Sequence, residues 1–173
     1  MKKLILILSI FGATHASAGI LLEPYVGYHI AKGELSGFAD DDITGLGFGG
    51  RIGWTLPLVF IAFDYSMAGV ETDDGTTKTD ADYTAMGLVV GAALPIIRVW
   101  AGYNFAAELE FDGGSKLEGA GMKAGLGFKL PVLPLSFNLE YILNEYDESD
   151  GASISNKYEQ KGLFISVSAP FNL

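Results

Sequence analysis

The sequence contains no cysteine, and it is poor in histidine, proline and basic residues. Without cysteine the chain can form no disulfide, no thiolate metal site and no lipid-modified cysteine anchor. Eleven lysines and arginines stand against 21 aspartates and glutamates, and the net charge of −10 argues against nucleic acid as a partner. Phosphate loops, zinc motifs and dinucleotide fingerprints are also missing, so we expect no cofactor and no metal site.

Long hydrophobic runs are missing as well, although the chain as a whole is apolar. Hydrophobic residues make up 49% of the sequence, and the mean hydropathy is +0.30. No uninterrupted apolar stretch after the N-terminal segment is long enough for a transmembrane helix. A chain this acidic and this apolar must keep its charges and its apolar surface in different zones. In lipid the remaining spanning structure is a closed β-barrel, because every backbone N–H and C=O must be paired.

The first 18 residues have the features of a secretory signal peptide. The Met-Lys-Lys start is basic, residues 4–11 are mostly apolar, and Ala-Ser-Ala at 16–18 is a small-residue cleavage site. Cleavage before Gly19 would leave one domain, residues 19–173, with a net charge of −12. The alternative is a buried N-terminal helix.

Three similar tetrapeptides divide the rest of the chain: Leu-Pro-Leu-Val at 56–59, Leu-Pro-Ile-Ile at 94–97 and Leu-Pro-Val-Leu at 130–133. Each lies between segments that alternate apolar with small or polar residues, which is typical of strands with two unlike faces. Proline in second place fits position i+1 of a tight turn. We therefore predict an all-β fold, an eight-stranded antiparallel up-and-down transmembrane β-barrel. Its predicted strands are residues 21–31, 44–56, 59–69, 83–94, 97–109, 118–130, 133–144 and 159–172.

Four longer connections alternate with the three short turns. They lie near residues 32–43, 70–82, 110–117 and 145–158 and contain 15 acidic and four basic residues. Short turns at one end and long acidic loops at the other are typical of bacterial outer-membrane barrels, whose short turns are periplasmic. We expect both termini on the short-turn side, hence in the periplasm.

The predicted strands place charges on one face and aromatic residues on the other. Every charged residue in the strand interiors falls on the face rich in glycine, alanine and serine. The outward aromatic residues form two bands at the expected headgroup levels. The band near the short turns is Trp54, Phe128, Phe137 and Phe171, and the band toward the long loops is Tyr28, Tyr65, Tyr103 and Tyr141. The alternative is a soluble barrel of the lipocalin kind, with its apolar face inward around a ligand.

The chain resembles the small eight-stranded outer-membrane barrels, the group of OmpX and the OmpA transmembrane domain. The resemblance rests on the opening Pro24-Tyr25-Val26-Gly27-Tyr28, on Tyr103, and on the alternating C-terminal segment 163–173. It implies the outer membrane of a Gram-negative bacterium and the outer-membrane insertion machinery as an assembly partner.

The short turns also predict which inward charges meet. If Pro57 and Leu58 are the two central turn residues, Arg51 lies opposite Asp64. The same rule applied to the turn at 130–133 places Lys123 opposite Glu140. Unpaired charges are costly in a narrow lumen, so we predict these two ion pairs. Further members of the lumen network are expected among Glu23, His29, Arg98 and Glu108.

We expect a non-enzymatic barrel with a structural and surface-interaction role, a plugged lumen and acidic extracellular loops. The main alternative is a porin-like narrow channel for small solutes. A more distant alternative is a lipid A-modifying enzyme, but the mature chain has a single histidine, His29, to serve a hydrolytic site. The expected partners are outer-membrane lipid and lipopolysaccharide, the latter bridged by divalent cations to the acidic loops. We expect a monomer.

Overall fold

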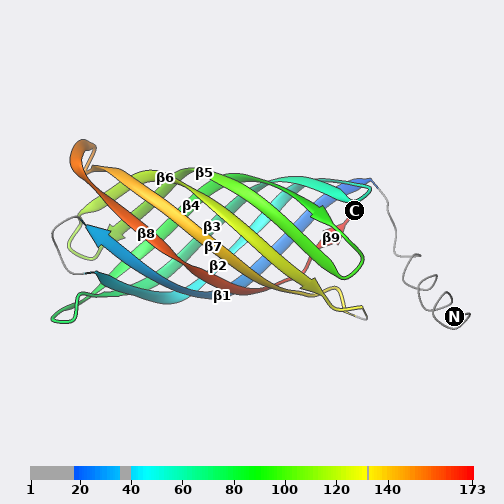
Figure 1. Ribbon diagram of the computed structural model, residues 1–173, viewed down its shortest axis with the longest axis horizontal. Coiled ribbons are helices and arrows are strands. Elements are labelled where there is room, and N and C mark those ends of the chain that lie inside the picture. The colour runs from blue at the N-terminus through cyan, green and yellow to red at the C-terminus, as the bar shows by residue number, and fades with distance from the viewer. Residues whose placement is uncertain (1–17, 36–39, 132) are drawn as a thin grey trace, which may run out of the picture.

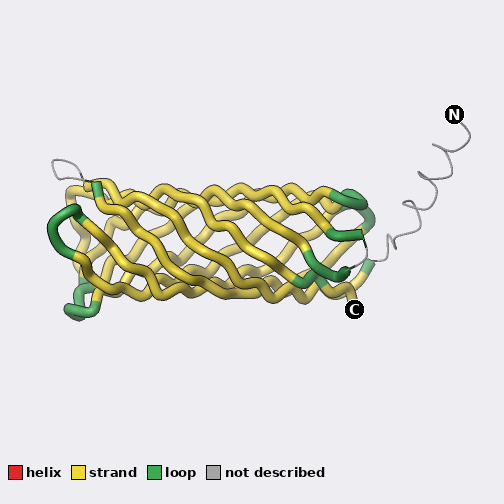
Figure 2. The backbone as a smooth tube through the Cα atoms, turned by 90° about the horizontal axis from the view of Figure 1, so that it is seen from below, coloured by secondary structure: helices red, strands yellow, loops and turns green. Residues whose placement is uncertain are grey.

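In the computed structural model the chain forms a closed eight-stranded antiparallel barrel (Figures 1 and 2). The structure describes residues 18–35, 40–131 and 133–173, so the predicted signal peptide lies outside the described residues except for Ala18. Within these ranges no helix is long and apolar enough to cross a membrane. The strands are β1 (Gly19–Leu35), β2 (Asp41–Leu56), β3 (Val59–Asp73), β4 (Lys78–Ala93), β5 (Ile97–Phe111), β6 (Lys116–Lys129), β7 (Ser136–Ser149), β8 (Ala152–Ser168) and β9 (Phe171–Asn172).

Each strand from β1 to β7 pairs with the next one along the chain, and β1 closes the barrel by pairing also with β8 and β9. The predicted fold class is therefore confirmed. Strand β9 continues the line of β8 after a break at Ala169-Pro170, where proline offers no backbone N–H. The sequence had predicted one continuous last strand.

The two ends of the barrel differ, and we name them by their residues. The proline end carries the connections 57–58, 94–96 and 130–135, and the acidic end carries the connections 36–40, 74–77, 112–115 and 150–151. The beginning of β1 and the C-terminus both lie at the proline end, since Ile20 and Leu173 exchange backbone hydrogen bonds of 3.0 and 2.9 Å.

The predicted long loops at the acidic end are wrong, because the strands continue through them. Strands β7 and β8 are joined by Asp150 and Gly151 alone, both with positive φ (51° and 77°), as a type I′ turn requires. A closed barrel offers each strand a partner on both sides, so the ladder can run on beyond the apolar band. Most residues assigned to acidic loops therefore lie on strands.

The turn between β6 and β7, in contrast, is longer than predicted, and this shifts the register of the two strands. The backbone N–H of Leu130 donates to Leu135 at 2.9 Å, so four residues rather than two lie between them. Pro134 is the physical reason, since it has no N–H to donate to a ladder. Lys123 consequently lies opposite Ile142 instead of Glu140, and Glu140 lies opposite Gly125.

A β-bulge in β5 reverses which side chains face the lumen. The pairing of β5 with both neighbours is irregular between Asn104 and Ala107. Asn104 is inward, but after the bulge Ala107 and Leu109 are inward and Glu108 is outward. The predicted inward position of Glu108 is therefore wrong.

Inward glycines make room for large aromatic side chains in the lumen. A Cβ atom added to Gly125 would lie 2.2 Å from the ring of Trp100, and one added to Gly49 would lie 2.5 Å from the hydroxyl of Tyr25. Both aromatic residues are buried inside the barrel. The many glycines on the inner face thus reflect close packing rather than an open pore.

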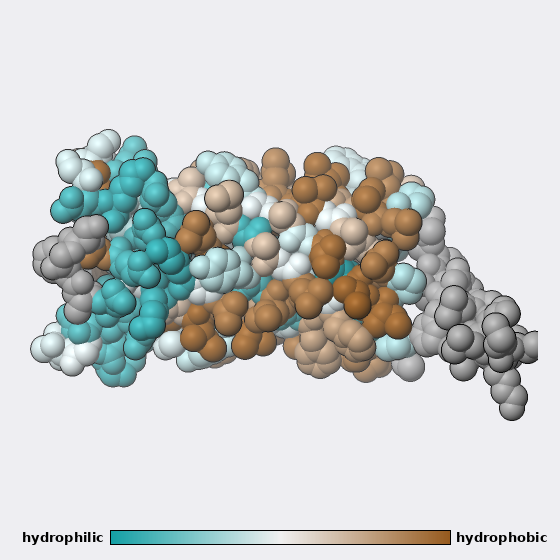
Figure 3. Space-filling view, viewed as in Figure 1, coloured by the Kyte–Doolittle hydropathy of each residue, from teal (hydrophilic) through white to brown (hydrophobic). Residues whose placement is uncertain are grey.

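The outer face is apolar over the half of the barrel nearer the proline end. Figure 3 shows hydrophobic atoms over this zone and hydrophilic atoms gathered at the acidic end. On β4 the change falls between the outward residues Leu88 and Thr84. The apolar zone is exposed in the isolated molecule, as a lipid-facing surface must be.

This arrangement predicts a position-dependent cost for charge on the outer face. Val90→Arg should lower the free energy of unfolding by about 2–4 kcal/mol, because it places a charge well inside the outward apolar zone. Thr84→Arg lies on the same face of the same strand but outside the apolar zone, toward the acidic end, and should cost much less. Urea unfolding in phospholipid vesicles measures both, and equal costs would contradict a membrane boundary between them.

Candidate functional site

An ionic network fills the lumen in the half of the barrel nearer the proline end, and Arg51 on β2 is at its centre. Its Nε donates to Asp64 Oδ2 on β3 at 2.8 Å, and its Nη2 donates to Glu140 Oε1 on β7 at 2.7 Å. Nη1 lies 3.6 Å from Glu23 Oε1 on β1. Arg51 is only 1% exposed, so one guanidinium joins three carboxylates in a space closed to solvent. The predicted Arg51–Asp64 ion pair is present.

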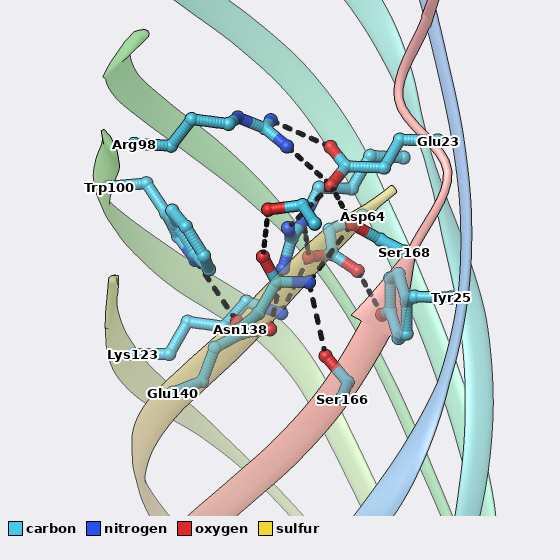
Figure 4. A network of polar contacts seen from close by, with 12 residues as sticks. Glu23, Tyr25, Asp64, Arg98, Trp100, Lys123, Asn138, Glu140, Ser166 and Ser168 are labelled. Carbon is cyan, nitrogen blue, oxygen red and sulfur yellow. Dashed lines mark hydrogen bonds and ion pairs between the residues drawn. The ribbon is translucent and has the colours of Figure 1, made fainter. Parts of the chain in front are cut away.

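Two further bases complete the charge balance of the network (Figure 4). Arg98 on β5 binds both carboxylate oxygens of Glu23, at 2.6 and 2.7 Å. Lys123 on β6 places its Nζ 3.0 Å from Asp64 Oδ2. Three bases therefore meet three acids, which satisfies the requirement that buried charges be paired.

The predicted Lys123–Glu140 ion pair is wrong. Both residues face the lumen and belong to the network, but the two-residue register shift separates them. Lys123 pairs with Asp64, and Glu140 pairs with Arg51. The shift preserves the inward orientation, because a displacement by two residues leaves each side chain on the same face of its strand.

Neutral side chains that were not among the predicted members of the network support it. The Tyr25 hydroxyl donates to Asp64 Oδ1 at 2.6 Å, and Trp100 Nε1 donates to Glu140 Oε2 at 3.1 Å. The Arg51 guanidinium lies between these rings, 4.7 Å from the Trp100 centroid and 5.1 Å from that of Tyr25. Ser168 donates to Glu23 at 2.7 Å. Inward tyrosine and tryptophan could have indicated this role, since their polar atoms need partners when buried.

The network lies between two apolar layers. On the side of the proline end, Leu21, Phe60, Val89 and Trp100 belong to one buried cluster. On the side of the acidic end, a larger cluster fills the lumen with small aliphatic side chains and tyrosines. The larger cluster contains Ala31, Ile43, Ala68, Val70, Ala81, Tyr83, Ala85, Ala107, Leu109, Tyr146 and Tyr158.

Amide and phenol groups form a second polar layer, to which two tyrosines of the larger cluster contribute their hydroxyl groups. Asn144 accepts a hydrogen bond from Asn104 at 3.2 Å and donates to Tyr83 and Gln160 at 3.1 Å each. Tyr146 donates to Gln160 at 2.7 Å. This layer is uncharged, so it adds hydrogen bonds across the lumen without changing the charge balance.

Four further residues were expected in the network, and the structure places two of them there. Glu23 and Arg98 belong to it, as described above. His29 is inward but contacts aromatic rings, stacked on Phe164 at 4.2 Å between centroids, and its Nε2 has no hydrogen-bond partner. Glu108 lies outside the lumen at the acidic end and pairs with Lys116 at 3.1 Å.

The predicted aromatic bands lie on the outer face. The side chains near the proline end are all exposed there, while Tyr65 is half-buried among its neighbours. The exposed members are Trp54, Phe128, Phe137, Phe171, Tyr28, Tyr103 and Tyr141.

The outer face at the acidic end carries charges on every strand. Five lysines there each lie within 4.0 Å of an acid on a neighbouring strand: Lys32, Lys78, Lys116, Lys157 and Lys161. Acids outnumber these lysines, and carboxylates directly face each other across several strand pairs. These opposed pairs include Asp42–Asp73, Glu71–Asp80, Asp82–Glu110, Glu108–Glu118, Glu118–Glu148 and Glu145–Glu159.

No preformed metal centre is present among residues 18–35, 40–131 and 133–173, since no three histidine, aspartate or glutamate side chains are grouped to hold an ion. In the 74–77 connection, Asp74 accepts hydrogen bonds from the backbone N–H groups of Thr77 and Thr76 at 2.7 and 2.8 Å. These bonds lower the pKa of the Asp74 carboxyl, so it remains ionised. The negative charge of Asp74 is therefore retained at neutral pH.

Solved structures resemble this barrel along nearly their whole length. Neisserial surface protein A (NspA) superposes with a TM-score of 0.59 at 17% identity, covering 90% of this chain and 99% of NspA. Ail, the attachment invasion locus protein of Yersinia pestis, gives 0.56 at 14% identity, covering 88% and 99%. The chain has the fold of the small eight-stranded outer-membrane barrels. No family profile and no curated protein sequence matches it.

Removal of Arg51 should destabilise this outer-membrane barrel more than any single neutral change in the lumen. Arg51→Met leaves Glu140 without a counter-charge and removes one of the two bases from Asp64 and from Glu23, which should cost about 3–5 kcal/mol of unfolding free energy. The double variant Arg51→Met/Glu140→Gln should recover part of this loss. Lys32→Met, at an exposed ion pair, is the control with little expected effect. Urea unfolding in vesicles gives the values, and a neutral Arg51→Met would contradict the central role of this guanidinium.

Proposed function

We propose that this protein is a non-enzymatic outer-membrane barrel with a sealed lumen, whose acidic end interacts with the outer cell surface. The observation that carries the proposal is the abrupt change on the outer face, from an apolar zone to a ring of carboxylates. A barrel with this outer face fits a bilayer at one end only. The proline end would then face the periplasm with both termini, and the acidic end would face outward.

The sealed lumen is supported by the order of layers along the barrel. A solute would have to pass an apolar layer with Phe60 and Trp100, the ionic network, and the layer with Tyr83 and Tyr146. Each of these side chains is at most 4% exposed. Eight strands enclose an interior that side chains can fill, which favours a plug over the alternative of a narrow channel.

Planar-bilayer recording tests the plug. The wild-type protein should give no stable unit currents, because no continuous water path crosses the two apolar layers. A Phe60→Ala/Trp100→Ala variant, which removes the large side chains of the apolar layer nearer the proline end, serves as the comparison for leakage. Reproducible single-channel steps from the wild-type protein would instead support the solute channel.

The acidic end favours a partner that supplies positive charge. Asp82 and Glu110 face each other directly across β4 and β5, and neither has an ion pair with a lysine among the described residues. Directly opposed like charges destabilise a strand pair. A divalent cation shared with a lipopolysaccharide phosphate would relieve this repulsion, because hard cations bind carboxylate and phosphate oxygens. We propose lipopolysaccharide, bridged in this way, as the partner of this end.

Ail has also been observed in complex with the heparin analogue sucrose octasulfate, with a TM-score of 0.57 to this chain at 13% identity, over 88% of this chain and 99% of that one. A polysulfated ligand fits the acidic end of the present chain poorly, since sulfates and carboxylates repel each other. The proposal here is therefore cation-mediated contact rather than direct binding of a polyanion.

Neutralising the opposed pair tests the bridge. In lipopolysaccharide bilayers with EDTA, Asp82→Asn/Glu110→Gln should raise the melting temperature by about 2–4 °C, because roughly 1 kcal/mol of repulsion is removed. Added magnesium or calcium should stabilise the wild-type protein more and cancel this advantage. Asp112→Asn/Asp147→Asn removes the same charge from positions that are not opposed, and should keep the full cation response. A cation response that is equal in all three proteins, or in pure phosphatidylcholine, would contradict the bridge.

A further inference from the structure

Lys129 differs from every other base in the described part of the chain. Each of the other lysines and arginines there has a carboxylate oxygen within 4.0 Å, and Lys129 has none. It is the last residue of β6, half-buried at the proline end. Glu23 is the acid that interacts with it electrostatically, but Glu23 already binds Arg98 and Ser168. Its ammonium group therefore has no carboxylate partner of its own.

Lys129 lines a cavity of about 210 Å³ at the mouth of the barrel. Leu21, Phe60 and Arg98 also line this cavity, and all three are buried, so they form its deep side. Arg98 is neutralised there by its two bonds to Glu23. The remaining free charge in the cavity is the ammonium group of Lys129.

The wall of the cavity toward its opening is formed by leucines of the three short connections. Leu58, Leu94, Leu130 and Leu133 line it, and Leu58, Leu94 and Leu133 are about half exposed in the isolated molecule. A charged group thus lies beside a deep apolar floor and beneath an apolar rim. This combination fits a ligand with one anionic group and one apolar chain.

Leu58 holds its place in this wall at a conformational cost. Its φ is 69°, in the left-handed region where glycine and asparagine are the usual residues of a turn. A glycine at this position would relieve the strain but would remove a side chain from the cavity wall. Strain that persists at one side chain is a reason to look for a role of that side chain.

We propose that the cavity binds a single-chain anionic amphiphile, a fatty carboxylate, with its head at Lys129 and its chain against the leucines. The volume of about 210 Å³ leaves room for one medium-length chain. A two-chain phospholipid is too large to enter. The site is independent of the acidic end, so it stands or falls apart from the proposed contact with lipopolysaccharide.

Titration with octanoate tests the site in protein reconstituted into phosphatidylcholine nanodiscs. Methyl NMR signals of Leu58 and Leu94 should shift saturably, and octanol should bind at least about tenfold more weakly because it lacks the charge-assisted contact. Lys129→Met should weaken octanoate binding to the level of octanol, and Lys129→Arg should restore it. Lys32→Met, which removes a lysine from the acidic end, is the matched control and should bind octanoate normally.

Leu58→Gly separates binding from folding. It should leave the unfolding free energy unchanged or raise it, since the strained φ is relieved, while octanoate binding weakens. Three outcomes would overturn the proposal: a linear shift that never saturates, equal binding of octanoate and octanol, or unchanged octanoate binding in Lys129→Met.

Discussion

The ionic network around Arg51 is the interaction on which the rest of this barrel depends. Its charged members come from six of the eight strands of the barrel and Ser168 from a seventh, so β4 alone contributes none of these residues. Replacing a buried ion pair by apolar residues is often neutral for stability, whereas breaking one is costly. We therefore regard the network as a determinant of register. A one-residue slip of any of the six strands that carry these charges would move an inward charge into lipid and leave its partner unpaired in the lumen.

Much of this architecture could be predicted from the sequence, because the alternation of side chains and the Leu-Pro turns are local. The Pro57-Leu58 turn has two central residues as predicted, so Arg51 lies opposite Asp64. The turn after β6 contains a second proline at 134, which could have indicated a longer connection. Without that correction the predicted partner of Lys123 was wrong by two residues, although its orientation was right.

Two other differences arise from backbone features that have weaker local signals. The bulge in β5 places one extra residue near Phe105 and turns Glu108 outward. The acid-rich segments were interpreted as loops, although Val70, Ala81 and Tyr146 alternate with their acids. In a strand that extends beyond the bilayer the outer face can be charged while the inner face remains apolar. The overall polarity of such a segment then resembles that of a loop, and the alternation of apolar and polar residues with a period of two is the feature that distinguishes the strand.

The same alternation of side chains places the unpaired charge outside the barrel at one end and inside it at the other. At the acidic end the inner face is packed with tyrosine and aliphatic side chains, and the excess charge is outside, where water and ions can reach it. At the proline end the strands finish inside the apolar zone, so the outer face carries leucine and proline. Lys129, the one base of the described residues without an ion pair, is turned inward there. Charge that solvent can screen costs little, whereas charge enclosed by apolar side chains needs a partner. Repulsion among carboxylates at one end and an unmatched ammonium at the other are therefore physically different states. The first calls for mobile cations at an open surface, and the second for an anion that can enter a confined one.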